Sequence, residues 1–257
     1  MTRALSIFIA LVALSLTASC ANPAEDRRLQ LEALSHLSTN SALPREQRVA
    51  MSLDILDSKT ADSARATMRW QAARNLGELR ALEAYNTLVK YGLSEFRDGD
   101  ASVRRECVIA LGKLPYSGPL DARRQALIDE AAPNRPHPYT LKKQIMSEER
   151  DPLARMAMLD TIITLGMRGG ADKQGYRDCA ACLEDIARQL DSERQGTRDF
   201  RAAEGMIERA FEGLALLTVT SDREAREQRR RFNTVTAYCD WWLDEHIKKM
   251  QRMDSLS

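Results

Sequence analysis

The chain has 257 residues, with 38 lysines and arginines against 37 aspartates and glutamates, so its formal net charge is +1. This balance argues against nucleic acid as a main partner, because phosphate binding takes a surplus of cationic contacts. Five cysteines in this length are too few for a scaffold built on disulfides.

The N-terminal twenty residues predict an export signal. Arg3 is followed by sixteen uncharged positions, Ala4 to Ser19, and the run ends in small residues before Cys20. A basic start, an apolar stretch and a small-residue cleavage zone are the layout of such a signal. At about 1.5 Å per residue the stretch reaches about 24 Å, which is short for a hydrocarbon core of about 30 Å. We therefore interpret residues 1–19 as a signal that is removed.

The segment Leu16-Thr-Ala-Ser-Cys20 resembles the lipobox of bacterial lipoproteins, in which the cysteine is diacylated and becomes the new N-terminus. The resemblance implies that Cys20 is the lipid attachment site and that residues 20–25 form a lipidated tether. Two acyl chains anchor a protein stably where a single chain does not. The resemblance also implies a location in the cell envelope, facing the periplasm. Because Ala21 follows the cysteine, the outer membrane is favoured over the inner one.

A second interpretation of this segment stays open. Ser19 and Ala21 are both small, as an ordinary secretory signal cut after Ala21 requires. Such a cut would discard Cys20 and release a soluble periplasmic protein.

The rest of the chain predicts an all-α fold. It is rich in alanine, leucine, arginine and glutamate, and its apolar residues recur at three- and four-residue spacing. No stretch has the alternation of a half-buried strand. Leucines between Leu29 and Leu37 predict an N-terminal capping helix. Apolar residues between Val235 and Ile247 predict a C-terminal capping helix, in which one indole of Trp241-Trp242 covers the open end of the fold.

An internal repeat organises the chain. The stretch from Thr67 to Gly77 returns 35 residues later as Ser102 to Gly112, with Arg69 aligned to Arg104. Between the copies, Leu82 to Tyr91 predicts a second helix. An acidic turn, Asp98-Gly-Asp100, precedes the second copy and suits a tight backbone conformation.

Glycines mark the end of each copy. Gly77 and Gly112 are expected to end their helices in the left-handed conformation that favours glycine. A weaker third copy runs from Asp151 through Arg155 to Gly166, and a divergent fourth begins at Asp199.

These segments resemble HEAT repeats, most closely the short bacterial kind. The resemblance rests on the aliphatic-Arg-x-x-small-x-x-x-Leu-Gly helix, on the acidic turn before it and on the period of the helix pair. It implies an α-solenoid of stacked antiparallel helix pairs over residues 26–257, with a capping helix at each end. In such an array each pair buries the apolar stripe of its neighbour. The architecture by itself says little about biochemistry.

The resemblance also implies that the arginine-bearing helices line the concave side of the solenoid. The candidate partner-binding residues are Arg69, Arg74, Arg104 and Arg105. A structural alternative stays open for two of them. Arg69 and Arg104 are also placed to hold the turns between repeats by hydrogen bonds to carboxylates such as that of Asp100.

Cys179-Ala-Ala-Cys182 is the one motif in the sequence that is typical of redox or metal-binding sites. A pair of this spacing at the start of a helix can form a redox-active disulfide, since the helix terminus acidifies the first thiol. Cys179, however, shares three- and four-residue spacing with Leu183 and Ile186, which favours a buried structural role. The sequence around the pair offers neither a βαβ context nor further zinc ligands.

The three histidines, His36, His137 and His246, have no catalytic surroundings. We therefore predict no catalytic residue, no cofactor and no metal site. The whole pattern predicts a non-enzymatic, lipid-anchored scaffold or adaptor that binds an envelope protein through its solenoid surface. The alternative is a periplasmic thiol protein that uses Cys179 and Cys182 for redox or metal chemistry.

Overall fold

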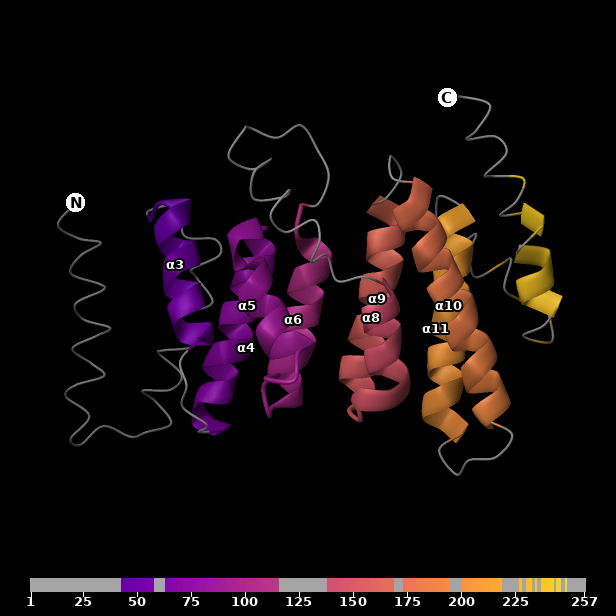
Figure 1. Ribbon diagram of the computed structural model, residues 1–257, viewed down its shortest axis with the longest axis horizontal. Helices are drawn as coiled ribbons and strands as arrows, with labels where there is room; N and C mark the ends of the chain where they lie inside the picture. Colours follow the sequence, from indigo (N-terminus) through magenta and orange to yellow (C-terminus); the bar gives the residue numbers. More distant parts are fainter. Residues whose placement is uncertain are drawn as a thin grey trace. The chain divides into compact units, whose positions relative to one another are not determined.

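A computed structural model describes residues 43–57, 63–115, 138–168, 173–194 and 200–218, together with part of the segment 227–248. All regular structure in these residues is helical, without a strand among them, so the all-α prediction is confirmed (Figure 1). Within the same residues, no helix has the length and apolar character needed to cross a membrane. The signal peptide, Cys20, the tether and the N-terminal capping helix lie outside the described part of the chain.

The chain folds as two compact units. The first comprises Met1–Tyr116 and Leu120–Ala131, and the second comprises Ser117–Pro119 and Ala132–Ser257. The described helices of the first unit are α3 (Arg45–Leu56), α4 (Ser63–Glu78), the short 3-10 helix η1 (Leu82–Ala84), α5 (Tyr85–Gly92) and α6 (Ala101–Lys113). Those of the second unit are α8 (Pro138–Lys143), the π-helical turn η3 (Gln144–Glu148), α9 (Pro152–Arg168), α10 (Lys173–Arg194) and α11 (Phe200–Thr218).

In the first unit the two copies of the repeat lie side by side. Helix α4 packs against α6, while α3 packs on α4 and α5 on α6. The Lys113 ammonium donates a hydrogen bond to the Glu78 carboxylate across the two helices. These residues are 35 positions apart, so the ion pair joins equivalent positions of the two copies. The apolar residues of the repeat form the core between the helices, with Leu76, Val103 and Leu111 fully buried.

Gly77 lies inside α4 in the helical conformation, and Gly112 lies inside α6. The expectation that they end their helices in the left-handed conformation is therefore wrong. A Cβ atom at Gly77 would stand 2.9 Å from the Cα atom of Ala110 in α6. Gly77 thus allows α4 and α6 to approach closely, which explains a glycine at this position of the repeat.

The left-handed residue at the end of α4 is Arg80, whose φ is 49°. Its N–H donates to the carbonyl oxygen of Gly77, and the N–H of Ala81 donates to that of Leu76. This pair of bonds is the Schellman arrangement that satisfies the last carbonyl groups of a helix. Arginine takes the place that glycine commonly holds there.

The second unit contains a core in which α9, α10 and α11 pack against one another. Gly166 in α9 touches both neighbours, since a Cβ atom there would lie 2.9 Å from the Cβ of Cys179 and 2.8 Å from the Cδ2 of Leu217. Gly213 in α11 is equally tight, because an added Cβ would collide with the Ile163 side chain. Glycine therefore sets the helix spacing in this unit as well.

Two glycines of α11 are expected to respond oppositely to alanine. Gly205→Ala should stabilise the protein by up to about 1 kcal/mol, because no atom lies within 4 Å of the added methyl group and alanine is the better helix former. Gly213→Ala should destabilise it by about 1–3 kcal/mol, because the methyl group overpacks the core. Urea unfolding of both variants measures the difference. Two shifts of the same sign would contradict the packing described for α11.

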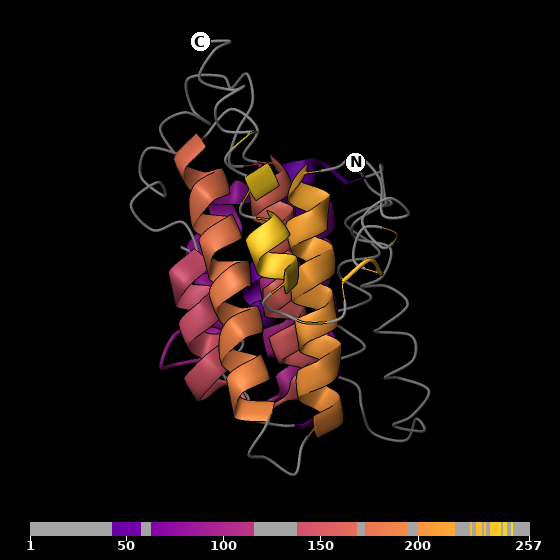
Figure 2. The ribbon, with the colours of Figure 1, turned by 90° about the vertical axis from the view of Figure 1, so that its right-hand side faces the viewer.

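The segment that follows α11 returns to cover it. The Tyr238 hydroxyl donates to the carbonyl oxygen of Phe211 at 2.9 Å, and the Trp242 indole N–H donates to that of Leu214 at 2.7 Å. Figure 2 shows the short helical segment that carries both residues lying against α10 and α11. The Trp242 side chain is buried against α11, whereas its predicted role in covering the open end of a solenoid stays a prediction.

Candidate functional site

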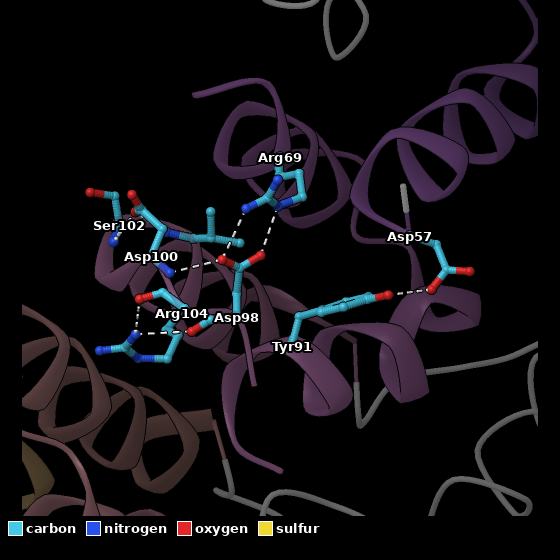
Figure 3. A network of polar contacts seen from close by, with 9 residues as sticks. Asp57, Arg69, Tyr91, Asp98, Asp100, Ser102 and Arg104 are labelled. Carbon is cyan, nitrogen blue, oxygen red and sulfur yellow. Dashed lines mark hydrogen bonds and ion pairs between the residues drawn. The ribbon is translucent and has the colours of Figure 1, made fainter. Parts of the chain in front are cut away.

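The arginine of the first repeat copy is committed to a buried ion pair. Arg69 Nε donates to Asp98 Oδ2 at 2.7 Å and Arg69 Nη2 donates to Asp98 Oδ1 at 3.1 Å (Figure 3). Only 8% of the Arg69 side chain and 6% of the Asp98 side chain are exposed. A bidentate pair of this kind fixes both side chains in one geometry. It joins α4 to the turn that precedes α6.

The same turn is held from its other side by the arginine of the second copy. Arg104 Nη1 donates to the backbone carbonyl oxygens of Asp98 and Gly99, at 2.9 and 3.0 Å. Asp100 caps α6, because its Oδ1 accepts the N–H groups of Ser102 and Val103. Both arginines therefore bond to this turn, as the structural alternative expects, with two differences. The carboxylate that binds Arg69 is that of Asp98 and not that of Asp100, and Arg104 bonds to the turn through backbone carbonyl oxygens.

In the second unit, the turn before α9 is held by hydrogen bonds of the same kind. Glu149 Oε1 accepts the N–H groups of Arg150 and Asp151, and Asp151 Oδ1 accepts that of Ala154. Asp98 Oδ1 accepts the Asp100 N–H in the same way. An acidic residue two positions before the capping aspartate is thus a feature of the repeat. The same spacing stands in the sequence, as Asp98-Gly-Asp100 and as Glu149-Arg-Asp151.

The other two candidate arginines are at least partly exposed. Arg74, in α4, is exposed. Arg105, in α6, has 34% of its side chain exposed and makes one polar contact of 3.3 Å, from Nη2 to Glu106 Oε1. The structure thus separates the four predicted residues into two pairs. Arg69 and Arg104 hold a turn, whereas Arg74 is exposed and Arg105 is partly exposed beside Glu106.

A second polar cluster of the first unit lies where α3 and α5 end. Asp57 accepts a hydrogen bond from the Tyr91 hydroxyl (Figure 3). It also accepts one from Lys90 Nζ at 2.8 Å. The hydrogen bond to Asp57 raises the pKa of Lys90, so the ammonium stays charged at neutral pH. Lys90 and Asp57 are both about half exposed, and such pairs contribute little stability. This cluster joins two helix ends, and sequence spacing does not reveal it.

The cysteine pair lies inside α10 and not at its start. Helix α10 begins at Lys173, six residues before Cys179, so the helix terminus does not acidify this thiol. Cys179 and Cys182 are both buried, together with Leu183 and Ile186, as the spacing predicts. Burial raises the pKa of the Cys182 thiol to about 12. The cysteines Cys107, Cys179, Cys182 and Cys239 form no disulfide within the part of the chain that is described.

Native Cys182 is expected to resist alkylation at neutral and mildly alkaline pH, because the thiolate is the reactive form and burial disfavours it. The raised pKa also predicts that folding stability falls as the pH rises from about 8.5, where an unfolded thiol ionises, toward about 12. Mass spectrometry after iodoacetamide treatment of folded and urea-unfolded protein measures the protection. Equal labelling rates in the two states would contradict the burial of Cys182.

Among the described side chains, no group of three or more histidine, cysteine, aspartate or glutamate residues is arranged to hold a metal ion. A scan against protein-family models, a search of curated proteins and a search of solved structures each find no match to this chain. The solvent-accessible surface of α4 and α6 around Arg74 and Arg105 is the candidate site that the described geometry offers.

Proposed function

We propose that the protein is a non-enzymatic, lipid-anchored scaffold of the bacterial cell envelope that binds a protein partner through the surface of its helical repeats. The HEAT family and the α-solenoid arrangement are part of this proposal, as is the outer membrane as its location. The observation that carries it is that the four repeat arginines fall into two pairs. Arg69 and Arg104 hold the turn between the copies by hydrogen bonds. Arg74 and Arg105, on the same two helices, remain at least partly exposed.

The stiff frame supports a binding role. Association costs less when the binding groups are already held in place before the partner arrives. In the first unit, the Arg69–Asp98 ion pair, the Asp100 cap and the close contact at Gly77 hold α4 and α6 in one arrangement. Charged groups on a fixed surface steer a partner and select for it.

The membrane anchor rests on the sequence around Cys20. We expect Cys20→Ser to abolish labelling of the protein with a palmitate analogue and to move it out of the membrane fraction. Loss of labelling with the protein still in the membrane fraction would require a different anchor. Labelling that persists in the variant would remove the lipoprotein part of the proposal.

Crosslinking in intact cells tests the scaffold role. We expect one reproducible envelope protein to be captured with the full-length chain and lost with the Arg74→Glu, Arg105→Glu double variant. Arg80→Glu is the control for charge reversal on α4, since Arg80 is an exposed arginine at the end of that helix and its substitution changes the charge by two units, as each single substitution of the double variant does. Loss of the captured protein with Arg80→Glu as well, or capture that the double variant leaves unchanged, would overturn the assignment of the binding surface.

The thiol alternative receives no support from the described geometry, because Cys182 is buried and the pair is remote from the start of α10. A Cys179→Ser, Cys182→Ser double variant should therefore keep partner capture. If this double variant keeps the circular dichroism spectrum of the unaltered protein but no longer captures the partner, the result would favour the thiol alternative.

A further inference from the structure

Equivalent positions of α4 and α6 lie opposite one another. The ion pair between Glu78 and Lys113 joins two residues 35 positions apart, which is the offset of the repeat. By the same offset, Arg74 is equivalent to Ile109 one turn before this pair, and Trp70 is equivalent to Arg105 one turn earlier still. We infer from the Glu78–Lys113 pair that each of these equivalent pairs lies side by side on the two helices. The exposed Arg74 and the partly exposed Arg105 then occupy one diagonal of a four-residue patch.

The other diagonal of the patch is apolar. Trp70 and Ile109 are half-buried, so each keeps part of its side chain in contact with solvent. An aromatic residue beside an arginine is a common centre of protein interfaces, because both residue types contribute strongly when a partner covers them. We call the surface made of Trp70, Arg74, Arg105 and Ile109 the diagonal patch.

The charge of the diagonal patch indicates its ligand. Arg74 and Arg105 supply two guanidinium groups, each able to bind a carboxylate with two parallel hydrogen bonds. The acidic side chain nearest in the sequence, Glu106, takes one long contact of 3.3 Å from Arg105 and is itself buried. The patch is therefore cationic on one diagonal and apolar on the other.

Helix geometry sets the spacing of the two arginines. One turn along a helix is about 5–6 Å, and packed helices lie about 8–10 Å apart. The Cα atoms of Arg74 and Arg105 are then separated by about 10 Å, close to the rise of about 9 Å over one three-residue turn of a polyproline II helix. Residues one and four of such a segment lie on the same side, so carboxylates at these positions reach both arginines, and the two residues between them project to either side of that diagonal.

We propose that the diagonal patch binds an acidic segment of the partner protein in the polyproline II conformation, in which two carboxylates three residues apart lie on one side and flank apolar side chains. The inference rests on the proposed scaffold function and adds the chemistry of the partner to it. The carboxylates pair with Arg74 and Arg105, and the apolar side chains cover Trp70 and Ile109.

Fluorescence anisotropy with labelled peptides tests the inference on the full-length protein in detergent. The probe peptide contains Glu-Leu-Phe-Glu, and the matched control peptide contains Gln-Leu-Phe-Gln. We expect the glutamate peptide to bind at least about tenfold more tightly than the control and to weaken as salt is added. Trp70→Ala should weaken binding of both peptides, because it removes the shared apolar contact.

A charge exchange makes the test specific. The Arg74→Glu, Arg105→Glu variant should lose the glutamate peptide and bind a Lys-Leu-Phe-Lys peptide in its place. Arg80→Glu should bind the glutamate peptide as the unaltered protein does. Circular dichroism spectra of the variants establish that they are folded before binding is measured.

Equal binding of the glutamate and glutamine peptides, or an unchanged preference in the charge-exchanged variant, would overturn the inference. So would the absence of saturable binding by any of the peptides. If an envelope partner is still captured in cells in a manner that depends on Arg74 and Arg105, the scaffold function stands and only the acidic segment is wrong. If no partner is captured, the scaffold function itself fails.

Discussion

Asp98→Ala is expected to lower the free energy of unfolding by about 3–5 kcal/mol, because it leaves the buried Arg69 guanidinium without its counter-charge. The substitution also removes the acceptor of the Asp100 N–H, which loosens the turn before α6. Urea unfolding followed by circular dichroism measures the change. The first unit should be affected most, so hydrogen exchange of α4 and α6 should rise more than that of α9 to α11.

Two further variants distinguish the loss of the buried Arg69–Asp98 ion pair from the loss of a charge at an exposed site. Glu78→Ala removes an ion pair that is partly exposed and should cost less than about 1 kcal/mol. The Arg69→Met, Asp98→Leu double variant removes both buried charges and should be less destabilised than the sum of the single variants. If Asp98→Ala costs no more than Glu78→Ala, the ion pair does not hold the turn.

Trp242→Ala is expected to destabilise the second unit by about 3–5 kcal/mol, the range found when a large buried aromatic side chain is removed. The Trp242 side chain is only 1% exposed, and its indole N–H is bonded to the Leu214 carbonyl oxygen at 2.7 Å. Its loss leaves a cavity over α11 and detaches the segment that covers this helix. Urea unfolding and hydrogen exchange of α10 and α11 measure the effect.

The neighbouring indole is the matched control. Trp241 is half-buried, so Trp241→Ala should cost distinctly less than Trp242→Ala. Tyr238→Phe removes only the hydroxyl that bonds to Phe211 and should cost about 1 kcal/mol. Similar losses from the two tryptophan variants would mean that this segment does not cover α11 in the way described.

Much of the local structure follows from sequence periodicity. Apolar residues at three- and four-residue spacing predict the helices because one face of each must be buried, and they also place Cys179 on a buried face. The 35-residue repeat predicts that α4 and α6 carry equivalent positions, since two similar segments bury similar faces. The acidic cap at Asp100 is a local interaction and is therefore predictable as well.

Contacts between helices could not be predicted in this way. The helix pattern does not tell whether Gly77 ends a helix or admits a neighbour, because both roles favour glycine. Helix α10 starts at Lys173 instead of near Cys179, a boundary that the spacing of its apolar residues does not fix. At Gly77 the deciding partner is Ala110, which lies far away in the sequence.

The amino-acid sequence by itself determined the all-α class, the repeat and the residue types on each helix face, because these depend on interactions within one or two helical turns. Only the tertiary structure decided which arginines are buried and which reach solvent. Arg69 finds the Asp98 carboxylate 29 residues away and is buried with it. Arg74, five positions further along the same helix, is rotated by about 140° and is exposed. A charged group is buried only where a partner offsets its lost hydration, and the packing of the helices supplies that partner.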